Sequence, residues 1–109
     1  MLFFKKKKVA DPNREDLALI ETNAKTVGVL VQETDDEDFR AQLTKLGEEL
    51  RYLDPSVKPE VYDYDKKIER LLGDLKTALE KCRGEAADDK SLGLLKDISV
   101  TIAARKVAE

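Results

Sequence analysis

One segment of the chain places an apolar residue at alternating steps of four and three positions. The rhythm has no interruption, and its positions are Val57, Val61, Tyr64, Ile68, Leu71, Leu75, Ala78 and Cys82. Such a repeat is typical of a helix that buries one stripe of side chains. Leu72 and Leu79 widen this stripe to about three positions in seven, which suits a helix that contacts more than one neighbour. The segment therefore predicts the longest helix of a bundle, from about Lys58 to Arg83.

The composition agrees with a helical fold. Charged residues make up 39% of the 109 residues and aromatic residues 6%, with only 5 glycines and 3 prolines, which favours helices over a sheet with many turns. A chain of this length is one domain by ordinary size statistics. We expect an N-terminal tail over residues 1–10 and a single helical domain over residues 11–109.

Two further helices are predicted before the long one. The first is expected to begin at Asp11-Pro12 and end near Glu33, with a stripe of Leu17, Ile20, Ala24, Val27 and Val31, widened by Leu30. The second begins after Thr34, whose spacing from Glu37 matches a capping box. Its stripe is Phe39, Leu43, Leu46, Leu50 and Leu53, and Asp54-Pro55 ends it.

A fourth helix follows the long one. Gly84 is a candidate for a left-handed stop, and Asp88 or Asp89 for the next cap. The stripe of this helix is Leu95, Ile98 and Ile102, with Leu92, Leu94, Ala103 and Val107 at its edges. Short connections favour antiparallel neighbours, so the sequence predicts an all-α, antiparallel up-down four-helix bundle. The alternative is a three-helix core whose fourth helix is donated to a second copy.

Groups that commonly carry catalysis are scarce. The sequence has no histidine, which removes the usual general base at neutral pH and the Glu-x-x-His pairs of di-iron bundles. The single cysteine, Cys82, lies on the predicted stripe, so we interpret it as a buried structural residue. The glycines form neither a phosphate loop nor a nucleophile elbow. We expect no enzyme activity, no cofactor and no small-molecule substrate.

Acidic residues suggest a metal site only weakly. Asp63, Asp65 and Glu69 are spaced to share an exposed face with Glu60, and carboxylates bind hard cations. The spacing of a calcium loop is missing, however. We therefore interpret these acids as a solvated face, and a carboxylate-based metal binder is the least favoured hypothesis.

Two tyrosines are candidates for contact with a partner protein. Tyr52 and Tyr62 fall off the best stripes, near the connection at Pro55, whereas Tyr64 lies on the stripe. Exposed tyrosines are common in protein interfaces. The alternative is that they pack across the end of the bundle.

The N-terminal head combines apolar and basic residues. Its members are Leu2, Phe3, Phe4, Lys5, Lys6, Lys7 and Lys8, and such a segment is a candidate for contact with an anionic membrane. The alternatives are a solvated basic tail, or Phe3 and Phe4 folding back on the bundle. The net charge is −3, so the remainder of the chain carries −3 − 4 = −7 without the four lysines. An acidic body repels phosphate backbones, and we expect no nucleic-acid partner.

Three functional hypotheses follow. The leading one is a non-catalytic interaction or assembly module that binds a protein partner or itself. The second is a peripheral membrane adaptor that uses the head, and the third is the metal binder. With one cysteine and no run of export-signal or membrane-spanning length, we expect a cytoplasmic protein, with the membrane surface as the alternative location.

Overall fold

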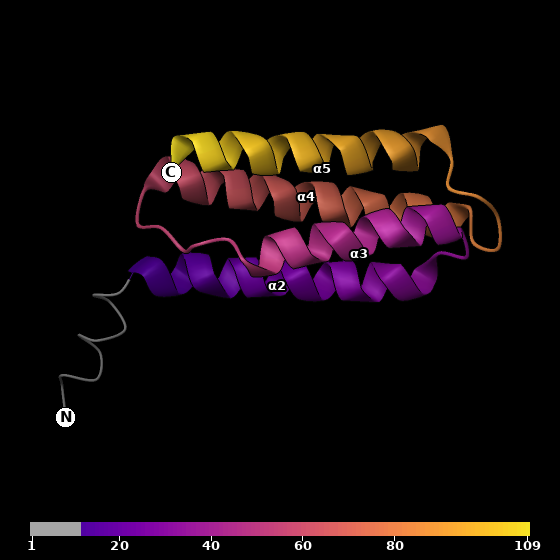
Figure 1. Ribbon diagram of the computed structural model, residues 1–109, viewed down its shortest axis with the longest axis horizontal. Helices are drawn as coiled ribbons and strands as arrows, with labels where there is room; N and C mark the ends of the chain where they lie inside the picture. Colours follow the sequence, from indigo (N-terminus) through magenta and orange to yellow (C-terminus); the bar gives the residue numbers. More distant parts are fainter. Residues whose placement is uncertain (1–11) are drawn as a thin grey trace, which may run out of the picture.

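The computed structural model describes residues 12–109 of the chain. The Leu2–Lys8 head and the predicted cap Asp11 lie outside these residues. The described part folds into four helices: α2 (Pro12–Glu33), α3 (Glu37–Arg51), α4 (Pro59–Lys81) and α5 (Asp89–Ala108). They run in alternating directions along a common axis (Figure 1). The predicted antiparallel up-down four-helix bundle is therefore confirmed.

The helices do not all pack in the order of the sequence. α4 packs mainly against α5 and α2, while α3 packs mainly against α2 and touches α5 only slightly. The consecutive helices α3 and α4 are therefore not a major pair, although the expectation of antiparallel neighbours holds for α2 with α3 and for α4 with α5. The connection over residues 52–58 carries the chain across the bundle, which leaves α2 and α4 as parallel neighbours (Figure 1).

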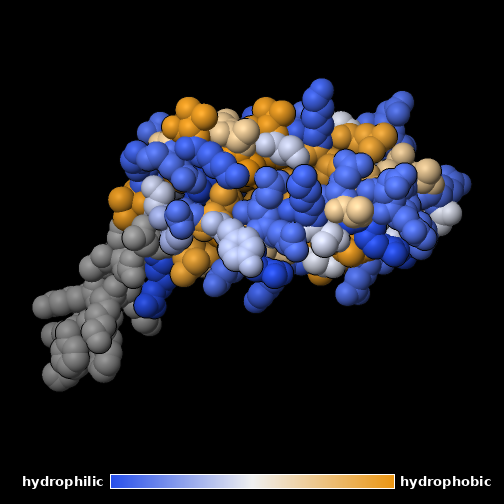
Figure 2. Space-filling model, in the orientation of Figure 1, coloured by the Kyte–Doolittle hydropathy of each residue, from blue (hydrophilic) through white to orange (hydrophobic). Residues whose placement is uncertain are grey.

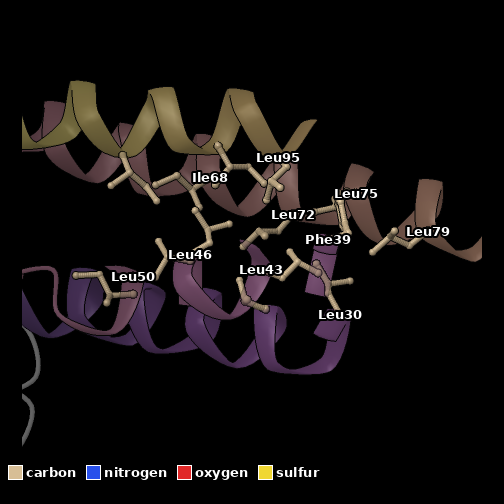
Figure 3. Packing of buried hydrophobic residues seen from close by; sticks show 14 of the residues in the cluster. Leu30, Phe39, Leu43, Leu46, Leu50, Ile68, Leu72, Leu75, Leu79 and Leu95 are labelled. Atoms are coloured by element: carbon tan, nitrogen blue, oxygen red, sulfur yellow. The ribbon is translucent and has the colours of Figure 1, made fainter. Parts of the chain in front are cut away.

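The core lies between the layer formed by α2 and α3 and the layer formed by α4 and α5 (Figure 1). Figure 3 shows leucines of α3 and α4 pointing into the same interior space, together with Phe39. The predicted stripe of α3 is confirmed at every position, because Phe39, Leu43, Leu46, Leu50 and Leu53 are all buried. Burying one such side chain stabilises the fold by roughly 1.5–3 kcal/mol. Cys82 is also buried, and its Sγ lies 3.5 Å from the carbonyl oxygen of Ala78.

The stripe of α4 differs from the predicted one at alternate positions. Its buried residues include Val61, Asp65, Ile68, Leu72, Leu75 and Leu79, whereas Tyr64 and Leu71 are half-buried. Val57 lies before the helix and is 58% exposed. The helix begins at Pro59, which suits a first helical position and leaves Val57 in the connection.

The ends of the helices follow the predicted signals with one correction. Thr34 does not cap α3: Asp36 is the cap, and its Oδ1 accepts a hydrogen bond from the Phe39 N–H at 3.1 Å. Thr34 instead accepts from the Asp36 N–H in the preceding turn. The predicted stop at Gly84 is confirmed by a φ of 85°. Of the two predicted candidates for the cap of α5, Asp88 is the cap, and it accepts from the Ser91 N–H at 2.9 Å.

α2 buries most of the predicted stripe, but the stripe does not include Leu17 and passes through two polar residues instead. Leu17 is 41% exposed, while Asp16 and Asn23 are buried together with Ile20, Val27 and Leu30. Within residues 12–109, no helix combines the length and the apolar character needed to cross a bilayer.

Candidate functional site

A fully buried arginine joins three of the four helices near one end of the bundle. Arg105 of α5 is 0% exposed. Its Nε donates to Asp65 Oδ1 of α4 at 2.7 Å, and its Nη2 donates to Asp16 Oδ2 of α2 at 3.2 Å. Both carboxyl side chains are 1% exposed. We call Asp16, Asp65 and Arg105 the carboxylate–arginine cluster.

The remaining donors of the guanidinium hold the chain around the cluster. Arg105 Nη2 also donates to the carbonyl oxygen of Asp54 at 2.8 Å, and Nη1 pairs with the carboxylate of Glu109. The backbone N–H of Ser56 donates to Asp16 Oδ2 at 2.6 Å. The cluster therefore fixes the connection over residues 52–58 and the end of α5 as well as the three helices.

Two carboxyl oxygens of the cluster lack a partner when both aspartates are ionised. These oxygens, Asp16 Oδ1 and Asp65 Oδ2, are then buried without a hydrogen-bond donor. Burial, which removes water from the charged form, is the main cause that raises the pKa of Asp65 to about 7. A hydrogen bond to the Asp16 side chain acts in the same direction, and the Arg105 guanidinium opposes both.

The enclosure of the cluster limits its chemistry. Its three side chains are at most 1% exposed, so a substrate has no route to them in this conformation. Removal of one partner of a buried ion pair strongly destabilises the folded protein, because the other charge is left without compensation. The arrangement therefore suits cross-linking of helices.

The acids singled out from the sequence do not form one site. Asp63 and Glu69 are exposed, but Asp65 is fully buried. The interpretation of Asp65 as part of a solvated face is wrong, because it points into the bundle toward Arg105. Across residues 12–109, no group of three or more Cys, Asp or Glu side chains is arranged to hold a metal ion.

Sequence reasoning missed most of the cluster, although a signal was present. Asp65 and Arg105 occupy positions of four-three stripes whose other members are apolar: Val61, Asp65, Ile68, Leu72 and Leu75 in α4, and Leu95, Ile98, Ile102 and Arg105 in α5. Asp16 and Asn23 occupy such positions in α2 with Ile20, Val27 and Leu30. Two carboxylates and an arginine at stripe positions indicate a buried ionic contact.

The two candidate tyrosines lie in different surroundings. Tyr52, just after α3, is 78% exposed. Tyr62, in α4, is half-buried, and Lys66 Nζ lies 5.7 Å from the centroid of its ring. Their role as a protein contact stays a prediction, as does membrane contact by residues 2–8.

α5 is apolar on its outer face as well as its inner one. Its exposed side carries a line of residues that we call the outer stripe of α5: Leu92, Gly93, Lys96, Val100, Ala103 and Val107. Leu92, Val100 and Val107 are 44%, 59% and 88% exposed, so Leu92, Ala103 and Val107 are not at the edge of the buried stripe as predicted. Apolar surface appears along the upper margin of Figure 2, where α5 lies in Figure 1.

Comparisons with known proteins add no assignment. No protein-family model, curated protein or solved structure matches the chain.

Proposed function

We propose that the protein is a non-catalytic interaction module that binds a helix of a partner protein along the outer stripe of α5. The observation that carries the proposal is the exposure of Leu92, Val100 and Val107 on one side of a helix whose opposite side is buried in the core. A helix that only packs in a bundle has a polar outer face. Exposed apolar side chains aligned along a helix support docking of a second apolar face.

The shape of the stripe favours a helical partner. From Leu92 to Val107 it extends about 22 Å at 1.5 Å per residue, which corresponds to four turns. Gly93 and Ala103 lie within it, and a Cβ added at Gly93 meets no atom within 4 Å. Small residues in an interface let two helices approach closely.

The charge of the stripe indicates the chemistry of the partner. Lys96 is the one charged residue on the stripe between Leu92 and Val107. A partner helix with apolar residues at steps of three and four and a carboxylate opposite Lys96 would complement it. A second copy of the chain offers no carboxylate in this part of its own stripe, so a different protein is the better occupant.

The test compares one substitution at two exposed valines. Val100→Glu places a charge in the stripe, whereas Val29→Glu places the same charge on α2 at a similar exposure of 49%. We then select the proteins that the wild-type chain and Val29→Glu capture but Val100→Glu does not. These proteins are tested for direct binding to the Lys96→Glu variant. We expect Lys96→Glu to weaken binding, and a partner variant with a lysine in place of its facing carboxylate to restore it.

Circular dichroism of each variant checks that the bundle is intact. Equal capture by all the variants contradicts the proposal. Light scattering tests the other possible occupant, which is a second copy of the chain. A dimer of the wild-type chain that is absent in Val100→Glu would show that a second copy binds the outer stripe of α5.

A further inference from the structure

The carboxylate–arginine cluster has one more negative group than its arginine can balance. Two carboxyl groups face a single guanidinium inside the bundle, and each gives one oxygen to Arg105: Oδ1 of Asp65 and Oδ2 of Asp16. The other oxygen of each carboxyl group is buried and has no donor if both groups are ionised. A buried acceptor without a donor and an uncompensated buried charge are both costly.

We propose that Asp65 carries a proton and donates it in a hydrogen bond to the carboxylate of Asp16, and that loss of this proton at alkaline pH loosens α5 from α2 and α4. With one proton on the pair, one carboxylate balances the arginine and both leftover oxygens are satisfied by the same hydrogen bond. Without it, two carboxylates repel each other in the interior.

The surroundings offer no other group to compensate the second charge. α2 contributes Asn23, whose Nδ2 donates to the backbone carbonyl oxygen of Asp65 at 3.2 Å. The Ser56 N–H is already bound to Asp16 Oδ2, and the Nζ of Lys58 is bound to the carbonyl oxygen of Glu109 at 2.6 Å. Glu109, 33% exposed, adds a negative charge on the far side of Arg105. None of these groups donates to the two leftover oxygens.

The direction of the pH effect follows from proton linkage. An aspartate in the unfolded chain releases its proton near pH 4, whereas the pKa of Asp65 in the folded chain is about 7. Between these values the folded state binds one more proton than the unfolded state, so unfolding releases a proton. The unfolding equilibrium constant therefore rises by roughly tenfold per pH unit as pH rises, and levels off above the folded pKa.

The composition makes this effect observable. The chain has no histidine, which is the side chain that ordinarily titrates between about pH 5 and 8. A change in stability across that interval is therefore attributable to a perturbed group.

The first experiment is urea unfolding of the full chain from about pH 5.5 to about pH 8, with Asp65→Asn as the variant. Asparagine keeps an acceptor for Arg105 Nε and an N–H donor for Asp16, and it has no proton to lose in this range. We expect the unfolding constant of the wild type to rise by more than about tenfold, and that of Asp65→Asn to stay level. Asp63→Asn is the matched control, because Asp63 is an exposed aspartate of the same helix; it should follow the wild type.

A second experiment needs no variant to fold. In wild-type protein labelled with ¹³C at the aspartate carboxyl carbons, one resonance should titrate near pH 7. Hydrogen exchange, corrected for its intrinsic pH dependence, should show that amides of residues 101–108 lose protection as pH rises toward about 7, and that they lose more protection than the amides of α3. The proposal is wrong if every aspartate titrates below about pH 5, or if Asp65→Asn follows the wild-type pH profile.

Discussion

The two ends of the bundle use aspartates in opposite ways. At the end where α2 and α4 begin, Asp65 is buried against Arg105, and burial raises its pKa to about 7. At the other end, Asp36 joins two connections, because its Oδ1 accepts from the Phe39 N–H and its Oδ2 accepts from the Ala87 N–H at 3.0 Å. These backbone hydrogen bonds lower the pKa of Asp36. The same side chain thus serves as a proton carrier where water is excluded and as an anionic cap where water is near.

The two ends of the bundle also differ in how many stabilising hydrogen bonds depend on one residue. At the buried end, one guanidinium binds groups from α2, α4 and the connection after α3. At the capped end the bonds are separate: Arg40 donates to the carbonyl oxygens of Val31 and Thr34, and Asp88 caps α5 independently. A single change should therefore cost much more at the buried end.

Arg105→Met tests this difference most strongly. It leaves Asp16 and Asp65 buried without their cation, and we expect a loss of about 3–5 kcal/mol in the free energy of unfolding at neutral pH. Lys106→Met removes an exposed cation from the neighbouring position and should change stability little. Urea denaturation of both proteins measures the difference, and equal stabilities would contradict the central role of Arg105.

Replacing the whole cluster should reverse that loss. In a variant with Asp16→Leu, Asp65→Leu and Arg105→Met, no charge remains to be compensated, and a buried ionic group exchanged for apolar residues is often neutral or stabilising. We expect its free energy of unfolding to return close to that of the wild type and to vary little between about pH 5.5 and pH 8. A triple variant as unstable as Arg105→Met would mean that the hydrogen bonds to Asp54 and Ser56 matter more than the charges.

The sequence predicted the fold because the fold depends on periodicity. The stripe of α3 contains only apolar residues, and its prediction was correct at every position from Phe39 to Leu53. The predictions of a helix stop at Gly84 and of a cap at Asp88 were also correct, since each of these residues acts on the backbone within a few positions. The order of packing was harder to predict, because the crossing over residues 52–58 depends on tertiary contacts.

The carboxylate–arginine cluster was not predicted, because charged residues interrupt the apolar stripes that bury it. The stripe of α4 was assigned to Tyr64 and Leu71 because that phase contains no charged residue, whereas the buried phase passes through Asp65. A carboxylate is assumed to face water unless its partner is known. The partner, Arg105, lies 40 positions away in the sequence, so no local pattern connects the two.

The caps at the other end should show smaller losses that depend on how many bonds are removed. Asp36→Ala removes the cap of α3 and the bond to the Ala87 N–H, whereas Asp88→Ala removes only the cap of α5. We expect both variants to have a lower Tm than the wild type, with the larger decrease for Asp36→Ala, and both decreases should be smaller than that of Arg105→Met. If Asp88→Ala lowers the Tm as much as Asp36→Ala, the bond between the two connections contributes nothing.

The smallest expected effect is a change in acid sensitivity. Hydrogen bonds from Ser91 lower the pKa of Asp88 below its ordinary value of 3.8, so its contribution to stability is present above that value and is lost as pH falls through the folded pKa. Asp88→Asn keeps a side-chain acceptor for the Ser91 N–H but takes up no proton in acid. Thermal unfolding should therefore show a shallower decrease in Tm below about pH 4 for Asp88→Asn, and an unchanged profile between about pH 5.5 and pH 8. Asp65→Asn should instead change the profile between about pH 5.5 and pH 8 and leave it unchanged below about pH 4, because the pKa of Asp65 is about 7. If Asp88→Asn and Asp65→Asn change the Tm over the same pH range, the two ends of the bundle do not titrate separately.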